Sequence, residues 1–291
     1  MEMNANMMDQ ASFEFSELTR SQLPALHLLQ NLGYTYLSPR EALALRGGRA
    51  DAVLLESVLL DWLARNNEIQ YHGQRYPFSE ANIHTAVQVL KETLSIGLLR
   101  TNESIFDLLS LGKSLPQSIN GNLKSFSLRY IDWEHPEQNV YHVAEEFAVE
   151  RRGSHETRRP DLVLFVNGIP FGVIECKSPD LKDPMTQAIS QQIRNQKEDE
   201  IPALFQYAQL LLAVSGNEAK YATVGTPAKF WSIWKEESDT FEKTVKAIVD
   251  QPLSRGQIQA LYDAFPGKHR IEAVNNLNLP RVVCAQDRAI Y

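Results

Sequence analysis

The sequence has few cysteines and no long apolar run. Its two cysteines, Cys176 and Cys284, are too few for a disulfide framework or a zinc cluster. No apolar run approaches the ~18–20 residues that a membrane-spanning helix needs. The first ten residues, MEMNANMMDQ, carry acids rather than Lys or Arg and lack the apolar region of a signal peptide. These absences predict a cytoplasmic protein without a membrane partner.

An excess of basic residues is also missing. The net charge is −7, which is unfavourable for a protein that binds nucleic acid, because phosphate contacts need a basic field. One local exception is RRGSHETRR, residues 151–159, with four arginines against one glutamate. A nucleotide-binding loop is lacking as well: DLLSLGKS, residues 107–114, ends in Gly-Lys-Ser, but Asp107 stands where the first glycine is needed.

The hydrophobic periodicity predicts an α+β fold. Helices are expected over residues 17–32, 50–65, 80–94 and 185–196, and again from residue 237. Strands are expected from about residue 125, over 139–150, 162–166, 169–177, 209–216 and 220–226. This order predicts a mixed central sheet flanked by helices. It divides the chain into a mostly helical part (1–124), a core (125–236) and a helical linker (237–291).

A hairpin in the middle of the chain carries charges near one end. Asn167-Gly168 is a strong turn signal between two apolar runs, and Asp161, Glu175 and Lys177 interrupt the far ends of those runs. A strict two-residue loop would place Asp161 and Glu175 on opposite faces. A three-residue loop with a glycine bulge would place the two carboxylates opposite each other with Lys177 on the same face. We favour the bulged register because it gathers the three charges.

Two adjacent carboxylates repel each other unless a cation lies between them. An oxygen-only pair suits Mg²⁺, with Mn²⁺ as a substitute, and a nearby lysine can position water and offset charge on a phosphorane-like transition state. The pattern predicts phosphodiester hydrolysis. The alternative is that these are solvated charges or a salt bridge, but burying charge without a purpose is costly. Glu145 and Glu146 are further candidates for the metal site, unless strand alternation explains them.

The string RRPDLVLFVNGIPFGVIECKS, residues 158–178, resembles the PD-(D/E)xK nuclease superfamily at Pro160-Asp161 and Glu175-Cys176-Lys177. It is most similar to the N-terminal endonuclease domain of the type I restriction enzyme R subunit. That similarity extends over residues 187–237, including GTPAKFW, and covers roughly half of the chain. The resemblance implies a restriction-endonuclease-like core.

The resemblance also implies roles for particular residues. Asp161, Glu175 and the Cys176 carbonyl would bind the metal, and Lys177 would be the catalytic lysine. The family carries a Gln-x-x-x-Tyr motif on the helix after the lysine strand, and Gln192 occupies the place of its glutamine. Gln196 replaces its tyrosine. The residues expected to approach the DNA backbone are Arg158, Arg159, Gln192 and Arg194.

In the family, the R subunit continues into a helicase-like motor driven by ATP and works with modification and specificity subunits on double-stranded DNA. The motor is absent from these 291 residues. The ending RVVCAQDRAIY reads as an interrupted segment. Because the motor uses the ATP, we expect ATP to be needed only in the missing motor. Two hypotheses therefore follow: a metal-dependent DNA endonuclease module, or a non-catalytic DNA-holding or subunit-docking module that retains the nuclease fold.

Overall fold

A seven-stranded mixed sheet forms the centre of the molecule. The computed structural model describes residues 17–92, 96–216, 218–234, 243, 246–265 and 267–277. Along the sheet the strands are β1 (Thr35–Leu37), β6 (Tyr141–Glu145), β9 (Leu162–Val166), β10 (Ile169–Cys176), β11 (Leu210–Ser215), β12 (Glu218–Ala222) and β13 (Ser232–Ile233). The pairs β1–β6 and β10–β11 are parallel and the other neighbours are antiparallel. The predicted α+β class with a mixed central sheet is confirmed.

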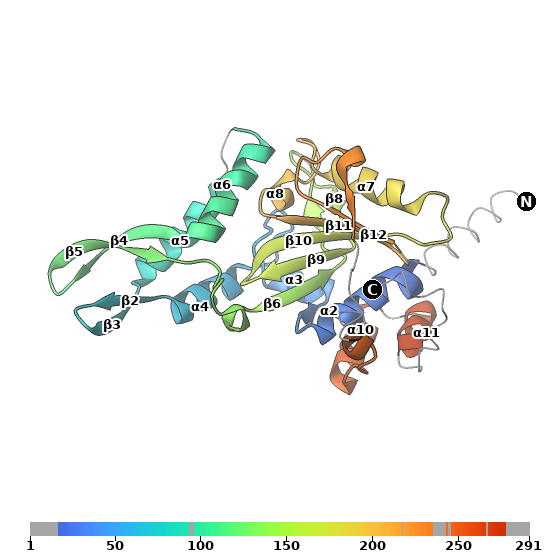
Figure 1. Ribbon diagram of the computed structural model, residues 1–291, viewed down its shortest axis with the longest axis horizontal. Helices are drawn as coiled ribbons and strands as arrows, with labels where there is room; N and C mark the ends of the chain where they lie inside the picture. The colour runs from blue at the N-terminus through green and yellow to red at the C-terminus, as the bar shows by residue number, and fades with distance from the viewer. Residues whose placement is uncertain are drawn as a thin grey trace, which may run out of the picture.

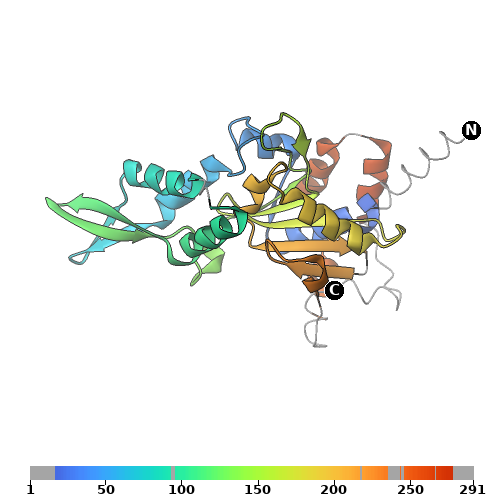
Figure 2. The same ribbon diagram turned by 90° about the horizontal axis from the view of Figure 1, so that it is seen from above.

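Helices cover both faces of this sheet (Figures 1 and 2). One face packs against α7 (Pro184–Asn195), and the other against α2 (Leu23–Asn31), α10 (Arg255–Ala264) and α11 (Lys268–Leu277). A short π-helix (Leu18–Gln22) precedes α2, and two further helices, α3 (Pro39–Ala44) and α8 (Pro202–Phe205), are short. Because both faces are covered, all five residues of β9 are buried, as its continuous apolar run predicts.

Two β-hairpins and three helices lie between residues 56 and 128. They form an arm that projects away from the sheet (Figure 1). The arm contains α4 (Glu56–Asn66), β2 (Glu68–Tyr71), β3 (Gln74–Pro77), α5 (Glu80–Lys91), α6 (Leu98–Leu111), β4 (Lys113–Ile119) and β5 (Asn122–Leu128). The segment from residue 125, expected as a core strand, instead pairs with β4 in this separate ribbon. β5 therefore crosses the boundary expected at residue 124, and β1 joins the central sheet from the part expected to be mostly helical.

The remaining elements are short. They are the two-residue strands β7 (Val149–Glu150) and β8 (Thr157–Arg158), which pair with each other, and the 3₁₀ turns at Pro136–Gln138 and Ala228–Phe230. The segment from residue 237, expected as a helical linker, lies partly outside the described residues. Its described helices α10 and α11 pack against the sheet rather than leading away from it. Residues 107–111 lie inside α6, and the described element before α6 is the helix α5 rather than a strand, which is not the strand–loop–helix context of a phosphate-binding loop for DLLSLGKS.

The hairpin of β9 and β10 has the expected register at its open end, but the extra residue that produces this register lies at a different place from the one expected. Val166 pairs with Ile169, so Asn167-Gly168 is a two-residue turn, and both residues have positive φ. The register shifts by one residue between Pro170 and Gly172, so the bulge lies inside β10 and not in the turn. The expectation of a three-residue loop was wrong. The gathering of the charges at the open end was right, because a bulge anywhere in the strand changes the facing side chains beyond it.

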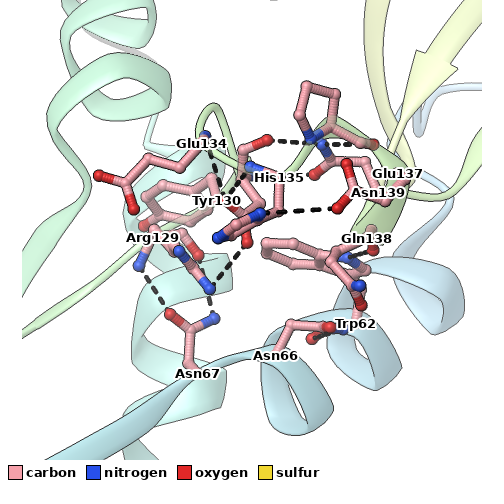
Figure 3. A network of polar contacts seen from close by, with 12 residues as sticks. Trp62, Asn66, Asn67, Arg129, Tyr130, Glu134, His135, Glu137, Gln138 and Asn139 are labelled. Atoms are coloured by element: carbon pink, nitrogen blue, oxygen red, sulfur yellow. Dashed lines mark hydrogen bonds and ion pairs between the residues drawn. The ribbon is translucent and has the colours of Figure 1, made fainter.

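The turn of this hairpin is buried at the base of the arm. The Asn167 side chain donates to the Tyr130 carbonyl at 2.9 Å and accepts from the Val140 amide at 2.8 Å. Figure 3 shows the adjoining network, in which Asn67 bonds both backbone groups of Arg129. These contacts tie the chain between the arm and β6 to the turn and fix one end of the hairpin.

We predict that Gly168→Ala destabilises the protein by more than about 2 kcal/mol. Its Cβ would lie 2.5 Å from the Leu55 carbonyl oxygen, and φ is +82°. The matched control is Gly121→Ala in the Asn-Gly turn between β4 and β5, where φ is +80° and nothing lies within 4 Å. There only the backbone cost of about 1 kcal/mol should appear. Urea denaturation measures both variants, and equal losses would refute the close contact.

Candidate active site

The open end of the β9–β10 hairpin brings together Asp161, Glu175 and Lys177. Asp161 immediately precedes β9, Glu175 is the last residue but one of β10, and Lys177 follows that strand. The Cys176 amide donates to Asp161 Oδ2 at 2.6 Å. Lys177 Nζ lies 3.8 Å from the same oxygen and donates to the Cys176 carbonyl at 2.8 Å. The three charged groups therefore form one cluster at one end of the sheet.

Both carboxyl groups are buried, at 7% exposure for Asp161 and 0% for Glu175. Burial raises the pKa of Asp161, although Lys177 and the Cys176 amide oppose that shift. Burial, followed by the charge of Asp161, raises the pKa of Glu175 well above its usual range. Burial alone would lower the pKa of Lys177, but the neighbouring carboxylates of Asp161 and Glu17 outweigh it and raise that pKa. The site is thus short of positive charge.

One oxygen of this cluster lacks a hydrogen bond. Glu175 Oε2 accepts from Gln191 Nε2 at 2.6 Å, whereas Glu175 Oε1 is buried without a partner among the described residues while both carboxyl groups are ionised. A protonated Glu175 would donate to the adjacent Asp161 carboxylate. No three His, Cys, Asp or Glu side chains of the described ranges are arranged to hold a metal ion. Two carboxylates, one of them with an unsatisfied oxygen, and the Cys176 carbonyl nonetheless suit an oxygen-ligated cation that keeps several waters. The residues present therefore fit Mg²⁺.

Two further carboxylates, Glu17 and Glu146, lie beside this cluster. Glu17 Oε2 lies 3.7 Å from Lys177 Nζ, and burial raises the pKa of Glu17. The Glu146 amide donates to the Asp161 carbonyl at 2.9 Å, and φ at Glu146 is +49°. Burial, followed by the charge of Asp161, raises the pKa of Glu146 to about 7. No local spacing could have predicted Glu17 here, because it lies far from the hairpin in the sequence.

The two glutamates at the end of β6 have different surroundings. Glu146 faces the cluster, whereas Glu145 is bound by Arg270 of α11 through two contacts of 2.7 Å. Tyr36 and Gln22 also donate to the Glu145 carboxylate. The charge of Glu145 also raises the pKa of Asp161, but these donors already bind its carboxylate. Of the two candidates that the sequence leaves open, Glu146 is therefore the one with no such arginine contact among the described residues.

The helix α7 contributes a different glutamine from the one expected. Gln192 is 0% exposed, and its amide donates to the carbonyls of Val173 and Leu212. This position gives no support to the expected DNA contact, since the side chain holds two strands together. Its neighbour Gln191 reaches Glu175 instead, and the residue four positions later is Asn195 rather than Gln196. Gln196 accepts a hydrogen bond from the Gly225 amide.

The arginines of residues 151–159 are mostly balanced by acids. Arg158 forms a two-point contact with Glu200, and Arg151 also pairs with that carboxylate at 3.3 Å. Arg152 pairs with Glu198. Arg159 is exposed, and its positive charge opposes the rise in the pKa of Glu146. On α7, Arg194 is exposed, and its charge opposes the rise in the pKa of Glu175.

Comparisons with known proteins point to one family. The family described as "Type I restriction enzyme R protein N terminus" matches residues 14–230. The chain belongs to this family. A relative from Methanocaldococcus jannaschii, named as the MjaIXP type I restriction enzyme endonuclease subunit, is 31% identical over 74% of this chain and 20% of the relative. The HindI endonuclease subunit of Haemophilus influenzae is 26% identical over 72% of this chain and 19% of its own length.

The chain thus spans about a fifth of the length of the curated relatives that it matches. The matched family is that of the N-terminal part of R proteins, and the mixed sheet with helices on both faces is consistent with a restriction-endonuclease-like core. Within the described residues, no helix has both the length and the apolar character needed to cross a membrane.

We predict that Glu175→Gln raises the free energy of unfolding of the metal-free protein by about 1 kcal/mol, because it removes repulsion between two buried carboxylates. The glutamine keeps an acceptor for Gln191. Urea denaturation in EDTA measures this change. Added Mg²⁺ should then stabilise the parent and not the variant. A variant less stable than the metal-free parent would contradict the inferred repulsion.

Proposed function

We propose that this module is a metal-dependent DNA endonuclease. The observation that carries the proposal is the pair of buried carboxyl groups, Asp161 and Glu175, with raised pKa values and one unsatisfied oxygen. These groups, with the Cys176 carbonyl, would hold Mg²⁺ or Mn²⁺, which would polarise the phosphate and lower the pKa of a bound water. Family membership supports this chemistry, since the relatives are named as endonuclease subunits.

Lys177 and Gln191 would have separate roles beside the metal ligands. Lys177 Nζ lies beside Asp161, where its ammonium can orient a water molecule and offset negative charge at the phosphate. Water would add to phosphorus, one ester P–O bond would break, and the leaving oxygen would take up a proton. Gln191 would hold the Glu175 carboxylate in place through its 2.6 Å hydrogen bond.

Double-stranded DNA is the proposed substrate, and Arg159 and Arg194 are the exposed arginines best placed to contact its phosphates. Nothing in the described site is arranged to read base edges, so sequence specificity would come from a specificity subunit, with a modification subunit as a second partner. ATP would serve a motor elsewhere in the enzyme. The complete assembly would act on unmodified foreign DNA in the cytoplasm.

The second candidate is a DNA-holding or docking module without catalysis. The acidic net charge of −7, together with the pairing of most of the arginines in residues 151–159, favours the docking form of this candidate, because both weaken attraction to DNA phosphates. Metal binding discriminates the two candidates: the nuclease needs a cation between Asp161 and Glu175, and the docking module does not.

We predict that the chain nicks supercoiled plasmid with Mn²⁺ or Mg²⁺ and that Lys177→Ala lowers the rate by about 100-fold or more. The control is Lys182→Ala, an exposed lysine five positions later, which should nick like the parent. If no variant nicks but calorimetry shows metal binding that Asp161→Ala abolishes, the site is intact and needs the rest of the enzyme. If the chain neither nicks the plasmid nor binds metal, the docking module is the remaining candidate.

We also predict that Arg159→Ala weakens DNA binding and lowers the slope of log K against log salt by about 1, the effect of losing one phosphate contact. Arg152→Ala is the matched control, since Glu198 already balances that arginine. Fluorescence anisotropy with a labelled duplex at several salt concentrations measures both variants. Equal slopes for the parent and Arg159→Ala would exclude Arg159 as a phosphate contact.

A further inference from the structure

A buried ion pair joins the C-terminal helices to the central sheet. Arg270 Nη1 and Nη2 each lie 2.7 Å from one oxygen of Glu145. Tyr36 Oη donates to Oε2 at 2.8 Å, and Gln22 Nε2 donates to Oε1 at 2.9 Å. Glu145 is 0% exposed and Arg270 4%. Four donors from three separate parts of the chain therefore converge on one carboxylate.

This carboxylate lies at the strand end on which Asp161 is supported. Glu145 is the last residue of β6. The amide of the next residue, Glu146, donates to the Asp161 carbonyl at 2.9 Å, and the Phe147 amide donates to the Pro160 carbonyl at 3.2 Å. Any rotation or shift of Glu145 would thus be transmitted through two main-chain hydrogen bonds to the segment that carries Asp161.

The helical pair α10–α11 packs on the back of the same strands. Its buried residues form one apolar cluster with β9 and β10, which includes Leu261, Val274, Leu162, Ile174 and Cys176. Arg270 Nε also donates to the Leu261 carbonyl at 2.9 Å, so the arginine connects α11 to α10 as well as to the sheet. Both helices lie beyond residue 230, where the family match ends.

Apolar residues of similar size often replace a buried ion pair without loss of stability, so packing alone does not require Arg270. The guanidinium of Arg270 instead fixes the orientation of the Glu145 carboxylate. Its planar fork fixes the orientation of a carboxylate through two parallel hydrogen bonds, which lysine cannot reproduce. A carboxylate held in this way is a rigid support for the backbone that follows it.

We propose that Arg270 is a positioning residue of the nuclease site, which acts through Glu145 and the end of β6 on Asp161. The inference rests on the proposed function for the role of Asp161. It makes the helical pair α10–α11 a part of the nuclease unit. Movement of this pair would change the site without any contact to DNA.

The test compares three variants of the full chain. Arg270→Met removes the fork, Arg270→Lys keeps the charge and loses one of the two contacts, and Val274→Ala removes buried packing from the same helix. Thermal denaturation first defines a temperature at which all three remain folded. Amide hydrogen exchange at Glu146 and Phe147 then reports local opening without any need for activity. Calorimetry with Mn²⁺ gives the metal affinity.

Arg270→Met should speed exchange of the Glu146 amide by about tenfold and weaken Mn²⁺ binding by about tenfold, the lower end for residues that support metal ligands. Arg270→Lys should lie between Arg270→Met and the parent, and Val274→Ala should match the parent in both. Equal exchange in Arg270→Met and Val274→Ala would overturn the proposal. Should Arg270→Met fail to fold, the comparison of Arg270→Lys with Val274→Ala decides in the same way.

The two proposals fail separately. A parent chain that binds no Mn²⁺ refutes the proposed nuclease function, and the exchange rates still show whether Arg270 holds the segment of Asp161. A parent that binds Mn²⁺, with unchanged affinity and exchange in Arg270→Met, refutes the positioning role alone.

Discussion

The pairing of β9 with β10 is the constraint on which the site depends. The Asn167-Gly168 turn is fixed at the base of the arm, and one bulged residue shifts the register along β10. Glu175 consequently faces α7 and Gln191, while Cys176 faces the cluster of α10 and α11. Since side chains alternate along a strand, a slip by one residue would exchange these two positions and bury Glu175 among apolar side chains.

The electrostatics of the site conflict with its stability. Two carboxyl groups are removed from water beside each other, and their charge is offset by the Lys177 ammonium, the Cys176 amide, Gln191 and the more exposed Arg194. Glu175 Oε1 remains unsatisfied. Strain of this kind usually persists at sites where a ligand relieves it. The contrast with Glu145 is informative, because four donors satisfy that carboxylate completely.

The sequence could predict what depends on local spacing. It predicted the mixed sheet, the hairpin and the gathering of Asp161, Glu175 and Lys177, because turn chemistry and alternation determine these. The expectation of a three-residue loop missed that the bulge lies inside β10, although Pro170 and Gly172 are a local signal for it, because proline and glycine within a central strand mark bulges. The sequence could not predict that Gln191 rather than Gln192 reaches Glu175, or that Arg270 reaches Glu145. Those contacts depend on how helices pack, which short patterns do not encode.

The arginine-rich segment shows the same limit and bears on how the module would bind DNA. Read as sequence, residues 151–159 form a basic patch. In the fold, the acids of residues 198–200 lie against it, and Arg151, Arg152 and Arg158 all pair with them. The local field is therefore close to neutral, and long-range attraction of a polyanion is weak. The proposed DNA contact would then depend on Arg159, Arg194 and the metal itself, so tight binding would have to come from other parts of a larger assembly.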